Sequence, residues 1–427
     1  MEINQLLKGI DCGCGKQHRC DIAFIAIERG AICHLSRLCA DKQSVLLVAD
    51  ENTYAAAGVQ TEDALKGKAI RRVLFPGNTV LIPNEAAVAA VNSAMDGVEL
   101  LIGIGSGVIQ DLCKYVSHTR GVPYMVVATA PSMDGYASTG AAMIMGGMKV
   151  TYPAGLPYAI VADPSILKAA PMEMIQAGYG DIVGKFSSLN DWRLSHAVNG
   201  EYFCQNVYDI TMDMVQQTLA LAGGLLQRDE ESVRVLMEAL IIVGIAMSFV
   251  GSSRPASGSE HHLSHFFEIT GIVHRQEYFT HGIDVAYSTI VTAELRDALL
   301  KKQWPTRQYC PDRQAYVATM AKIYGSVAEG CIALQDKTGL YEEDMVSIYK
   351  AKEAEIRAIL SQMPKAQEIE AMLSAVGLEK QTFYQLYSHE KIADAISYAK
   401  ELKNRYSVLW LYHHLFGPYT GRPIETV

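Results

Sequence analysis

The sequence lacks an excess of basic residues, and it contains no low-complexity tract and no internal repeat. Its 427 residues carry a formal net charge of −9, and the sequence pI is about 5.8. A nucleic-acid-binding protein needs a basic face to meet phosphates, so this charge balance argues against that class. It does not exclude a small phosphorylated ligand, for which one or two local cations suffice.

A long hydrophobic run is also missing. The longest apolar stretch, residues 239–250, is shorter than the roughly 20 residues that a membrane-spanning helix needs, and it predicts a buried core helix. The first residues show no basic segment followed by an apolar run, so no secretory signal is expected. The nine cysteines are irregularly spaced, which favours reduced thiols and a cytoplasmic location without membrane insertion.

Two regions with different patterns follow one another along the chain. In the first, short apolar segments alternate with helical stretches, a pattern typical of a parallel sheet covered on both faces. The expected strands are residues 44–50, 70–75, 98–105, 123–129 and 158–163, and the expected helices include 85–95 and 108–119. A glycine pair between apolar segments at 141–155 predicts an inserted hairpin.

Helical periodicity dominates from about residue 171 onward. We therefore predict an α/β N-terminal domain at residues 1–168 and an all-helical C-terminal domain at residues 169–427. A cleft between two such domains is a favoured position for a ligand, so the active site is expected there.

A glycine-rich turn, "GIGSGVIQD" at residues 103–111, lies between an expected strand and an expected helix. Backbone N–H groups at such a turn can bind phosphate, and the helix dipole adds to the attraction. The turn departs from the G-x-G-x-x-G dinucleotide pattern, because residue 108 is valine, and no Gly-Lys-Ser/Thr follows as in a P-loop. A tight turn that merely needs small residues is the alternative interpretation.

The segment "ATAPSMDGYAS", residues 128–138, follows the next expected strand. Small and hydroxyl-bearing residues there surround one carboxylate, Asp134. Such a loop can follow a cofactor closely while its hydroxyls form hydrogen bonds. The alternative is an ordinary polar turn in which Asp134 bonds the local backbone.

Three histidines lie within five positions in "RPASGSEHHLSHFFEI", residues 254–269. His261 and His265 are four residues apart and share one face of a helix, whereas His262 points elsewhere. Asp181 and His281, each in an apolar helical context, could join His261 as one carboxylate and two imidazoles around a divalent ion. Taken singly, each of these residues is also compatible with an ordinary structural role.

Five segments resemble the sn-glycerol-1-phosphate dehydrogenase family and occur in the order expected for it. They are GIGSGVIQD, TAPSMDGYAS, GYGDIVGK, SRPASGSEHHLSH and THGIDVA. That family belongs to the superfamily of metal-dependent alcohol dehydrogenases, glycerol dehydrogenase and dehydroquinate synthase. The likeness runs from about residue 43 to 295, is closest to the bacterial branch, and is most specific in SRPASGSEHHLSH. It implies a Rossmann-like N-terminal domain and a helical C-terminal domain, and we expect a homo-oligomer, with a dimer favoured.

The resemblance also implies roles for individual residues. NAD(P) would be bound by residues of the N-terminal half: Asp50, Gly105, Ser106, Gly107, Val108, Ile109, Thr129, Ala130, Pro131, Ser132 and Ser138. A divalent ion, Zn²⁺, Ni²⁺ or Fe²⁺, would be bound by Asp181, His261 and His281. The substrate would be contacted by Asp134, Asp181, His265 and Arg254, of which Asp134 and His265 would be catalytic. Arg254 would meet the substrate phosphate, or else lie on the surface beside a helix.

The expected reaction is reversible hydride transfer between NAD(P)H and dihydroxyacetone phosphate, which gives sn-glycerol 1-phosphate. His265 would relay a proton or bind a substrate oxygen. The competing functions are a glycerol or other polyol dehydrogenase, and a nucleotide-binding homologue without catalysis. A dehydroquinate synthase-like lyase fits the fold but not the histidine segment.

The segment "CGCGKQHRC", residues 12–20, departs from the family pattern. It holds Cys12, Cys14, His18 and Cys20 close together, but a Cys-x-Cys pair is tighter than the usual zinc spacing of roughly two to four intervening residues. A loosely held segment with reduced thiols and a small metal site are both open interpretations.

Overall fold

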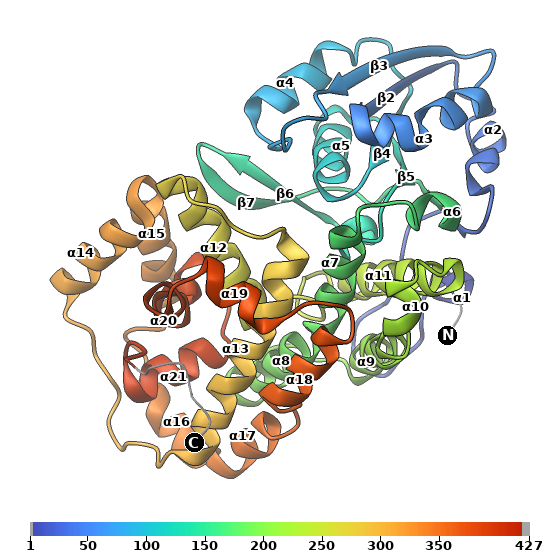
Figure 1. Cartoon of the computed structure of the whole chain (residues 1–427). Coiled ribbons are helices and arrows are strands. Elements are labelled where there is room, and N and C mark those ends of the chain that lie inside the picture. The colour runs from blue at the N-terminus through green and yellow to red at the C-terminus, as the bar shows by residue number, and fades with distance from the viewer. Residues whose placement is uncertain (1–2, 421–427) are drawn as a thin grey trace. The chain divides into compact units, whose positions relative to one another are not determined.

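The computed structural model describes residues 3–420 and divides into two compact units (Figure 1). Unit 1 comprises Met1–Ile182 and Asp209–Ser253, and unit 2 comprises Val183–Tyr208 and Arg254–Val427. The expected boundary at residue 168 rests on a change in the sequence pattern, whereas the two units are defined by the contacts between residues in the folded chain. The two divisions differ chiefly at 209–253, a helical segment that packs within unit 1.

Unit 1 is built on a parallel sheet of six strands in the order β1-β8-β5-β4-β2-β3. The strands are β1 Phe24–Ile27, β2 Ser44–Asp50, β3 Ala69–Phe75, β4 Leu100–Gly105, β5 Tyr124–Ala128 and β8 Ala159–Ala162. Because all six run the same way, the carboxyl ends of β2, β4 and β5 meet at one edge. Open α/β sheets bind their ligands at that edge.

Both faces of this sheet are buried, as the continuous apolar strands predict. Val45, Leu47 and Ile102 belong to one core cluster, while Leu46 and Val48 are equally buried on the opposite face of β2. Helices α3 (Glu51–Ala64) and α5 (Gly107–Arg120) pack against the central strands. The sheet thus holds the ends of its strands in fixed positions.

A separate two-stranded hairpin lies where the glycine pair predicts it. Strand β6 (Gly140–Met145) pairs antiparallel with β7 (Met148–Pro153), and Met145 is opposite Met148. The two turn residues, Gly146 and Gly147, have φ values of 60° and 77°. Two successive positive φ angles define the tight hairpin turn that favours glycine at both positions.

The remaining helices of unit 1 are short, apart from one. They are α1 Ile3–Leu6, α2 Leu35–Leu38, α4 Glu85–Ser93, α6 Pro164–Leu167 and α10 Ala222–Leu226, and α11 Glu230–Val250 is the long one. Helices α7 (Met172–Val183) and α9 (Gln205–Leu219) contain two of the three points at which the chain passes from one unit to the other, and the third lies between Ser253 and Arg254.

The apolar run at 239–250 forms the second half of α11 and is almost entirely buried, which confirms the expected core helix, although the helix extends beyond the run that the length argument used. The whole helix has 21 residues and is long and apolar enough to cross a membrane, but 78% of its most apolar window is buried inside the protein. That burial is typical of a core helix. A second stretch, Arg313–Thr338, meets the same criteria with 33% burial. It consists of two helices separated by a short turn at Gly325–Val327.

Among its described residues, unit 2 contains helices and the segments that connect them, but no strand. Its helices are α8 Lys185–Asn199, α12 Ser259–His274, α13 His281–Lys301, α14 Arg313–Tyr324, α15 Ala328–Thr338, α16 Met345–Ala351, α17 Glu353–Leu360, α18 Ala366–Ser374, α19 Lys380–Leu386, α20 His389–Tyr398 and α21 Val408–Phe416. Helices α12 and α13 pack against each other, and both also contact α8.

A buried carboxylate on α8, Asp191, fixes the start of α12. It accepts hydrogen bonds from the backbone N–H of Ser259 at 2.6 Å and of Val408 at 2.9 Å, and it pairs with Arg296 on α13 at 2.7 Å. Gly258, just before α12, has no room for a side chain, because a Cβ there would lie 2.7 Å from Ser188. These contacts set the position of the helix that carries the three histidines.

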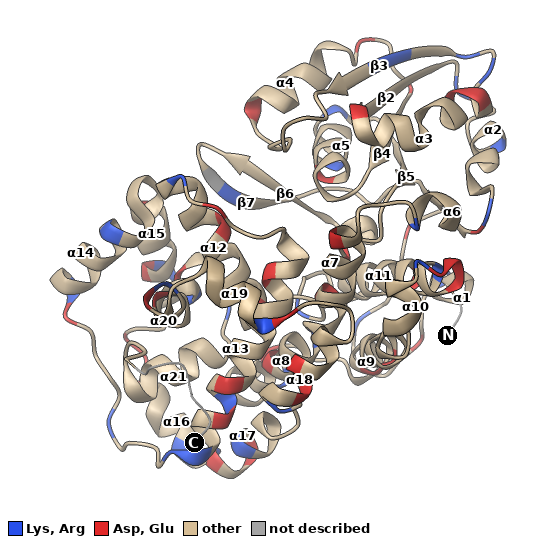
Figure 2. Cartoon of the chain, in the orientation of Figure 1, with Lys and Arg blue, Asp and Glu red and all other residues tan. Residues whose placement is uncertain are grey.

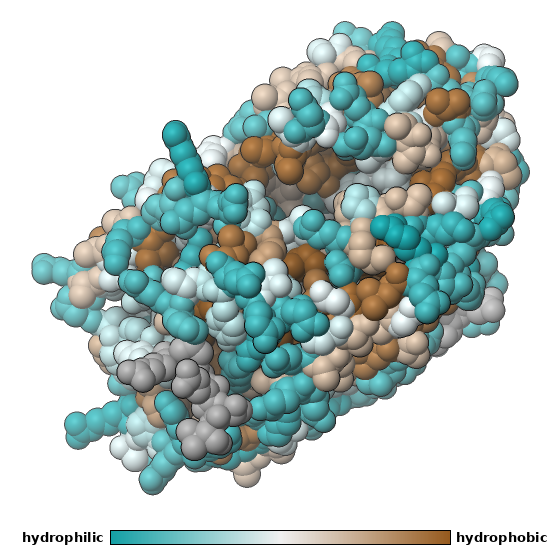
Figure 3. All heavy atoms as spheres, in the orientation of Figure 1, coloured by the Kyte–Doolittle hydropathy of each residue, from teal (hydrophilic) through white to brown (hydrophobic). Residues whose placement is uncertain are grey.

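The surface carries mixed charge. Basic and acidic residues are interspersed along the helices and strands in Figure 2, and hydrophilic residues cover most of the face drawn in Figure 3. Neighbouring opposite charges form exposed pairs such as Arg313 with Asp336, at 2.8 Å. Pairs of this kind contribute little stability individually.

Buried neutral histidines on α21 predict a loss of stability in mild acid. Burial lowers the pKa of His414 to about 4, while its ring lies 2.6 Å from the Tyr349 hydroxyl and 2.8 Å from the Leu340 carbonyl oxygen. Since the unfolded imidazole takes up a proton near pH 6.5, stability present above that pH is lost as the pH falls toward 4, by up to about 1.4 kcal/mol per pH unit. Replacing His414 with glutamine, which does not titrate, should flatten the profile of denaturant midpoint against pH in this window. A variant with the same slope as the wild type would contradict the assignment of this loss of stability to His414.

Candidate active site

The glycine-rich turn connects β4 to α5 at the carboxyl edge of the sheet. A Cβ on Gly103 would lie 2.8 Å from Gln110 Oε1, and one on Gly105 would lie 2.8 Å from Ile109 Cβ. Gln110 also donates to the Gly103 carbonyl at 2.9 Å. These two glycines are therefore required by the close packing of α5 on β4, as the alternative interpretation of a tight turn predicts.

Gly107 is different, because it has room for a side chain. A Cβ there would make only an ordinary contact, 3.5 Å from Met133. The residue before it, Ser106, gives α5 no side-chain cap, and the first turn of the helix carries no acidic residue. Ser106, Gly107 and Val108 are partly exposed, whereas Ile109 is buried against Gly105. A helix N-terminus of this kind is suited to an anion.

The loop after β5 is held rigidly beside this turn. The Thr129 N–H donates to the Gly105 carbonyl at 3.3 Å, and the Tyr136 hydroxyl donates to the Ala130 carbonyl at 2.6 Å. The sequence-predicted residues of this loop are all buried: Thr129, Ala130, Pro131, Ser132, Asp134 and Ser138. Small residues and internal hydrogen bonds thus leave the loop little freedom.

A buried lysine that the sequence does not single out, Lys114, organises the far end of the same loop. Its ammonium group donates to the carbonyls of Gly135 at 2.8 Å and Gly140 at 2.9 Å, and to the Ser138 hydroxyl at 3.1 Å. Burial lowers the pKa of Lys114, and the charge of Asp111 opposes that shift. Ser138 is therefore a member of an internal network.

Asp50 ends β2, the strand beside β4. Its carboxylate accepts from the Thr53 N–H at 2.8 Å and, with the Thr53 side chain, completes a capping box for α3. The register Val48↔Gly103 places Asp50 level with the end of β4. A structural role for Asp50 is thus evident, at a position compatible with the expected one beside a cofactor.

Asp181 lies on α7, against the loop that contains Asp134. Its carboxylate accepts from the Asp134 N–H at 3.0 Å. Gly178, one turn earlier, allows this approach, because a Cβ there would lie 1.9 Å from the Pro131 carbonyl oxygen. Gly244 on α11 serves the same loop, since its Cβ would lie 2.8 Å from the Asp134 carbonyl oxygen. Neither glycine is identified by sequence reasoning, because their contacts are remote along the chain.

Two of the expected histidine ligands face each other in unit 2. The rings of His261 on α12 and His281 on α13 have centroids 5.0 Å apart. His261 Nδ1 lies 2.7 Å from the buried Glu260 carboxylate, and His281 Nδ1 lies 3.2 Å from the Ser264 hydroxyl. Hydrogen bonds on Nδ1 orient both rings, and Nε2 of each ring would then be the atom that binds a metal, a common arrangement for histidine ligands.

Asp181, His261 and His281 together offer a donor set for a metal. One ligand atom from each residue lies within 4.8 Å of the other two. One carboxylate oxygen and two imidazole nitrogens suit a first-row divalent ion and leave coordination positions for water or substrate. The three residues therefore fit the group that the sequence resemblance implies.

His265 lies beside this donor set without being part of it. Its ring centroid is 5.5 Å from that of His281 and 6.3 Å from that of His261. Its side chain is partly exposed. The one-turn spacing thus places His265 on the same face of α12 as His261, near the ring of His281 on α13.

His262 is fully buried on another face of α12, and neither of its ring nitrogens has a hydrogen-bond partner among the described residues. Burial lowers its pKa well below the ordinary value, and nearby Lys403 and Arg405 add to the shift. His262→Ala should therefore reduce stability by about 2 kcal/mol through the cavity it leaves, while metal content stays normal. Thermal unfolding and metal analysis test this, with the exposed His118→Ala as control; loss of metal from the folded variant would contradict it.

Arg254 is buried, and its guanidinium is engaged by groups of the protein. Its guanidinium donates to the Glu201 carboxylate at 2.7 Å, to the Tyr406 carbonyl at 2.8 Å and to the Ser195 hydroxyl at 3.1 Å. The surface alternative is therefore wrong, and the expected contact with a substrate phosphate gains no support. The side chain instead anchors the segment that leads into α12.

Comparison with known proteins agrees with this architecture. Residues 26–171 match the family model of iron-containing alcohol dehydrogenases. A solved sulfoacetaldehyde reductase from Bifidobacterium kashiwanohense, in complex with NAD⁺, has a similar fold, with a TM-score of 0.60 at 14% identity, covering 93% of this chain and 98% of that one.

Two curated relatives are more similar in sequence. The glycerol-1-phosphate dehydrogenase (NAD(P)⁺) of Halalkalibacterium halodurans is 35% identical over 72% of this chain and 80% of the relative. The enzyme of the same name from Geobacillus stearothermophilus is 31% identical over 88% of this chain and 89% of the relative. The chain therefore belongs to the glycerol-1-phosphate dehydrogenase family of NAD(P)-dependent oxidoreductases.

Proposed function

We propose that the protein interconverts dihydroxyacetone phosphate and sn-glycerol 1-phosphate, with a divalent ion bound by Asp181, His261 and His281. The observation that carries this proposal is the donor set itself: one carboxylate and two imidazoles within 4.8 Å. Glu260 and Ser264 hold the two rings by their Nδ1 atoms, as in a site prepared for a metal. The names of the curated relatives support the substrate.

The proposed cofactor site is the carboxyl edge of the sheet in unit 1. The uncapped start of α5 would bind the pyrophosphate through backbone N–H groups, and the partly exposed Gly107 would let it approach. The rigid loop 129–138 would follow the cofactor farther along. Asp50 would lie near the adenosine end, in addition to capping α3.

The chemistry would be shared between bound groups and the chain. When bound, NAD(P)H would supply the hydride, and a divalent ion would supply a positive charge for the carbonyl oxygen. Asp181, His261 and His281 would hold that ion, and Asp134 donates its N–H to Asp181, which orients the carboxylate. His265 would exchange a proton with the substrate oxygen or hold it by a hydrogen bond.

NADH oxidation with dihydroxyacetone phosphate tests the proposal. The protein is stripped of metal and then given Zn²⁺, Ni²⁺ or Fe²⁺ separately, and dihydroxyacetone without phosphate is the matched control. Metal-dependent turnover of the phosphorylated substrate alone is the expected result. Turnover of only the free ketone would favour a polyol dehydrogenase, and NADH binding without turnover would favour a non-catalytic homologue.

The proposed pyrophosphate site predicts the effect of a charge at Gly107. Gly107→Asp should fold normally, because its Cβ has room and an acidic residue favours a helix N-terminus. A like charge about 4 Å from a phosphate costs on the order of 4 kcal/mol, so NADH should bind about 10²–10³-fold more weakly. Gly107→Asn has the same shape without the charge and should lose much less. Fluorescence titration with NADH measures both; unchanged affinity in the aspartate variant would remove this turn from the site.

A further inference from the structure

The N-terminal loop is closed and anchored, so its interpretation as a loosely held segment is wrong. The Ile10 N–H donates to the His18 carbonyl at 3.2 Å, which closes a loop over the residues between them. Gly9 makes this closure possible, because a Cβ there would lie 2.4 Å from the same carbonyl oxygen. Lys16 donates to the Val250 carbonyl at 3.0 Å and fastens the loop to the end of α11.

His18 is held in the orientation of a metal ligand. Its side chain is buried, and Nδ1 lies 3.0 Å from the Phe249 carbonyl oxygen. A carbonyl can only accept, so Nδ1 carries the proton and Nε2 presents its lone pair to the inside of the loop. There, Nε2 lies 3.1 Å from the sulfur atoms of both Cys12 and Cys14.

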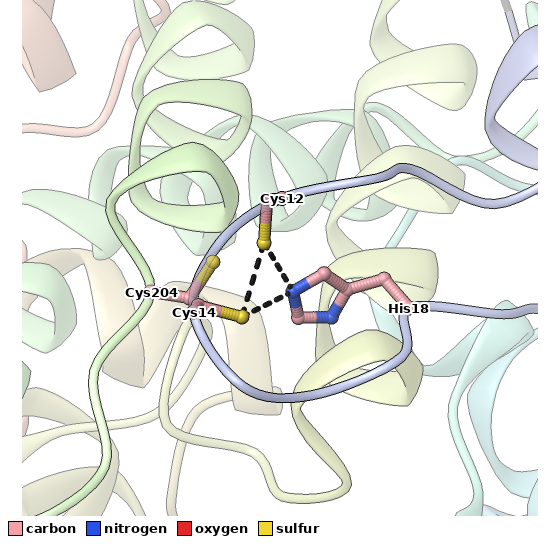
Figure 4. A group of neighbouring side chains, drawn as sticks. All are labelled: Cys12, Cys14, His18 and Cys204. Carbon is pink, nitrogen blue, oxygen red and sulfur yellow. Dashed lines mark hydrogen bonds between the residues drawn. The ribbon is translucent and has the colours of Figure 1, made fainter.

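A third cysteine from a remote part of the sequence completes the group. One ligand atom from each of Cys12, Cys14, His18 and Cys204 lies within 4.8 Å of the other three. Figure 4 shows the three sulfur atoms and the imidazole turned toward one another. Cys204 and His18 are buried, and Cys12 and Cys14 are half-buried. Cys20, the other cysteine of the N-terminal motif, is not a member.

We propose that Cys12, Cys14, His18 and Cys204 bind a structural Zn²⁺ ion. Three thiolates and one imidazole form a donor set typical of closed zinc sites. Tetrahedral zinc, with Zn–S near 2.3 Å and Zn–N near 2.0 Å, needs donors about 3.5–3.8 Å apart. The donors that contact one another here are 3.0–3.1 Å apart, so an ion requires them to open by less than about 1 Å. Gly13 and Gly15, which have open space around them, give the short Cys-x-Cys loop that freedom.

The site differs chemically from the proposed active site. It contains no carboxylate, and its four protein donors leave no coordination position for substrate. The ion would cross-link two segments that are far apart in the sequence, and its binding energy would add to the stability of the fold. All nine cysteines lie within the described residues, and none of them forms a disulfide. The sulfur atoms of Cys12 and Cys14 are 3.0 Å apart.

Zinc analysis of the full chain, purified under reducing conditions without chelator, tests the proposal. The His261→Ala variant serves as background, because it is expected to lack the active-site ion. About one zinc per chain should remain in it, and adding Cys14→Ser should remove that zinc. Cys33→Ser, at an exposed cysteine outside the group, is the matched control and should keep it. No zinc in the background variant, or zinc retained after Cys14→Ser, would overturn the proposal.

Cobalt substitution gives a second measurement that does not depend on a folded cysteine variant. Co²⁺ in the His261→Ala protein should show the intense visible absorption of a tetrahedral thiolate site, and added Zn²⁺ should abolish it. A spectrum without thiolate bands, or a Cys12–Cys14 disulfide found by mass spectrometry in the reduced protein, would overturn the assignment. Loss of turnover plays no part in either readout, so the result is independent of the proposed function.

Discussion

Replacing His261 with alanine is expected to remove the active-site ion and to lower turnover by about 10³-fold or more. Two remaining ligands cannot hold a catalytic ion tightly. The stabilisation that the ion would give to the charge developing on the carbonyl oxygen is worth several kcal/mol in the transition state. The variant should still fold, because Glu260 keeps its hydrogen bond from the Gly258 N–H at 2.7 Å. Metal analysis, turnover with NADH and a thermal melt on the same preparation measure the three properties.

A second histidine on α12 provides the control. His274 lies in the last turn of that helix and contacts the Ile323 carbonyl oxygen at 2.8 Å, away from the donor set. His274→Ala should keep its active-site metal. A His261→Ala protein with normal metal content at that site would contradict the assignment of this residue as a ligand.

Asp181→Asn tests the same site with a smaller change. The amide has nearly the shape of the carboxylate, and its oxygen can still accept from the Asp134 N–H, so the packing of α7 against the loop should persist. Only the charge and one donor oxygen are lost. Weaker metal binding with an unchanged melting temperature is the expected result, and His281→Ala should behave like His261→Ala.

The strands could be predicted from the sequence wherever they are buried apolar runs with polar ends. The sequence predicts β2 at its observed bounds, Ser44–Asp50, and places β3, β4, β5 and β8 within two residues. It does not predict β1 (Phe24–Ile27), whose four residues are too few to show a period, nor α3, which buries Ala57, Gly58 and Thr61 and has no apolar stripe.

The sequence predicts which residues could bind a metal, but not the contacts that hold these residues in place. Histidines at one-turn spacing and a carboxylate in an apolar helix are visible in the sequence, because charged groups in such places need partners. The contacts of Lys114 and Gly178 are visible only after folding, since each depends on a backbone approach between segments that are separated in the sequence. Arg254 is the opposite case. Its position in the sequence near the histidines suggested a contact with the substrate, but in the folded chain its guanidinium donates to the Glu201 carboxylate.

His265→Asn is the second variant with a large expected effect, because the possible roles of this residue predict different measurements. Its ring lies near those of His261 and His281, but it is not part of the donor set. If it serves the substrate, the variant keeps stoichiometric metal and near-normal NADH affinity, yet loses turnover. A lost acid–base group costs about 10²–10⁴-fold, or roughly 3–5 kcal/mol of transition-state stabilisation.

The other roles give other patterns on the same purified protein. A fourth metal ligand would show a fall in metal content in parallel with activity. A packing residue would show a lower melting temperature with unchanged turnover per folded molecule, an outcome that the partial exposure of His265 disfavours. A proton-transfer role carries one further signature: the pH dependence of kcat/KM should lose a limb in His265→Asn, and added imidazole should restore part of the rate. Unchanged turnover, or a pH profile identical to that of the wild type, would exclude the catalytic assignment.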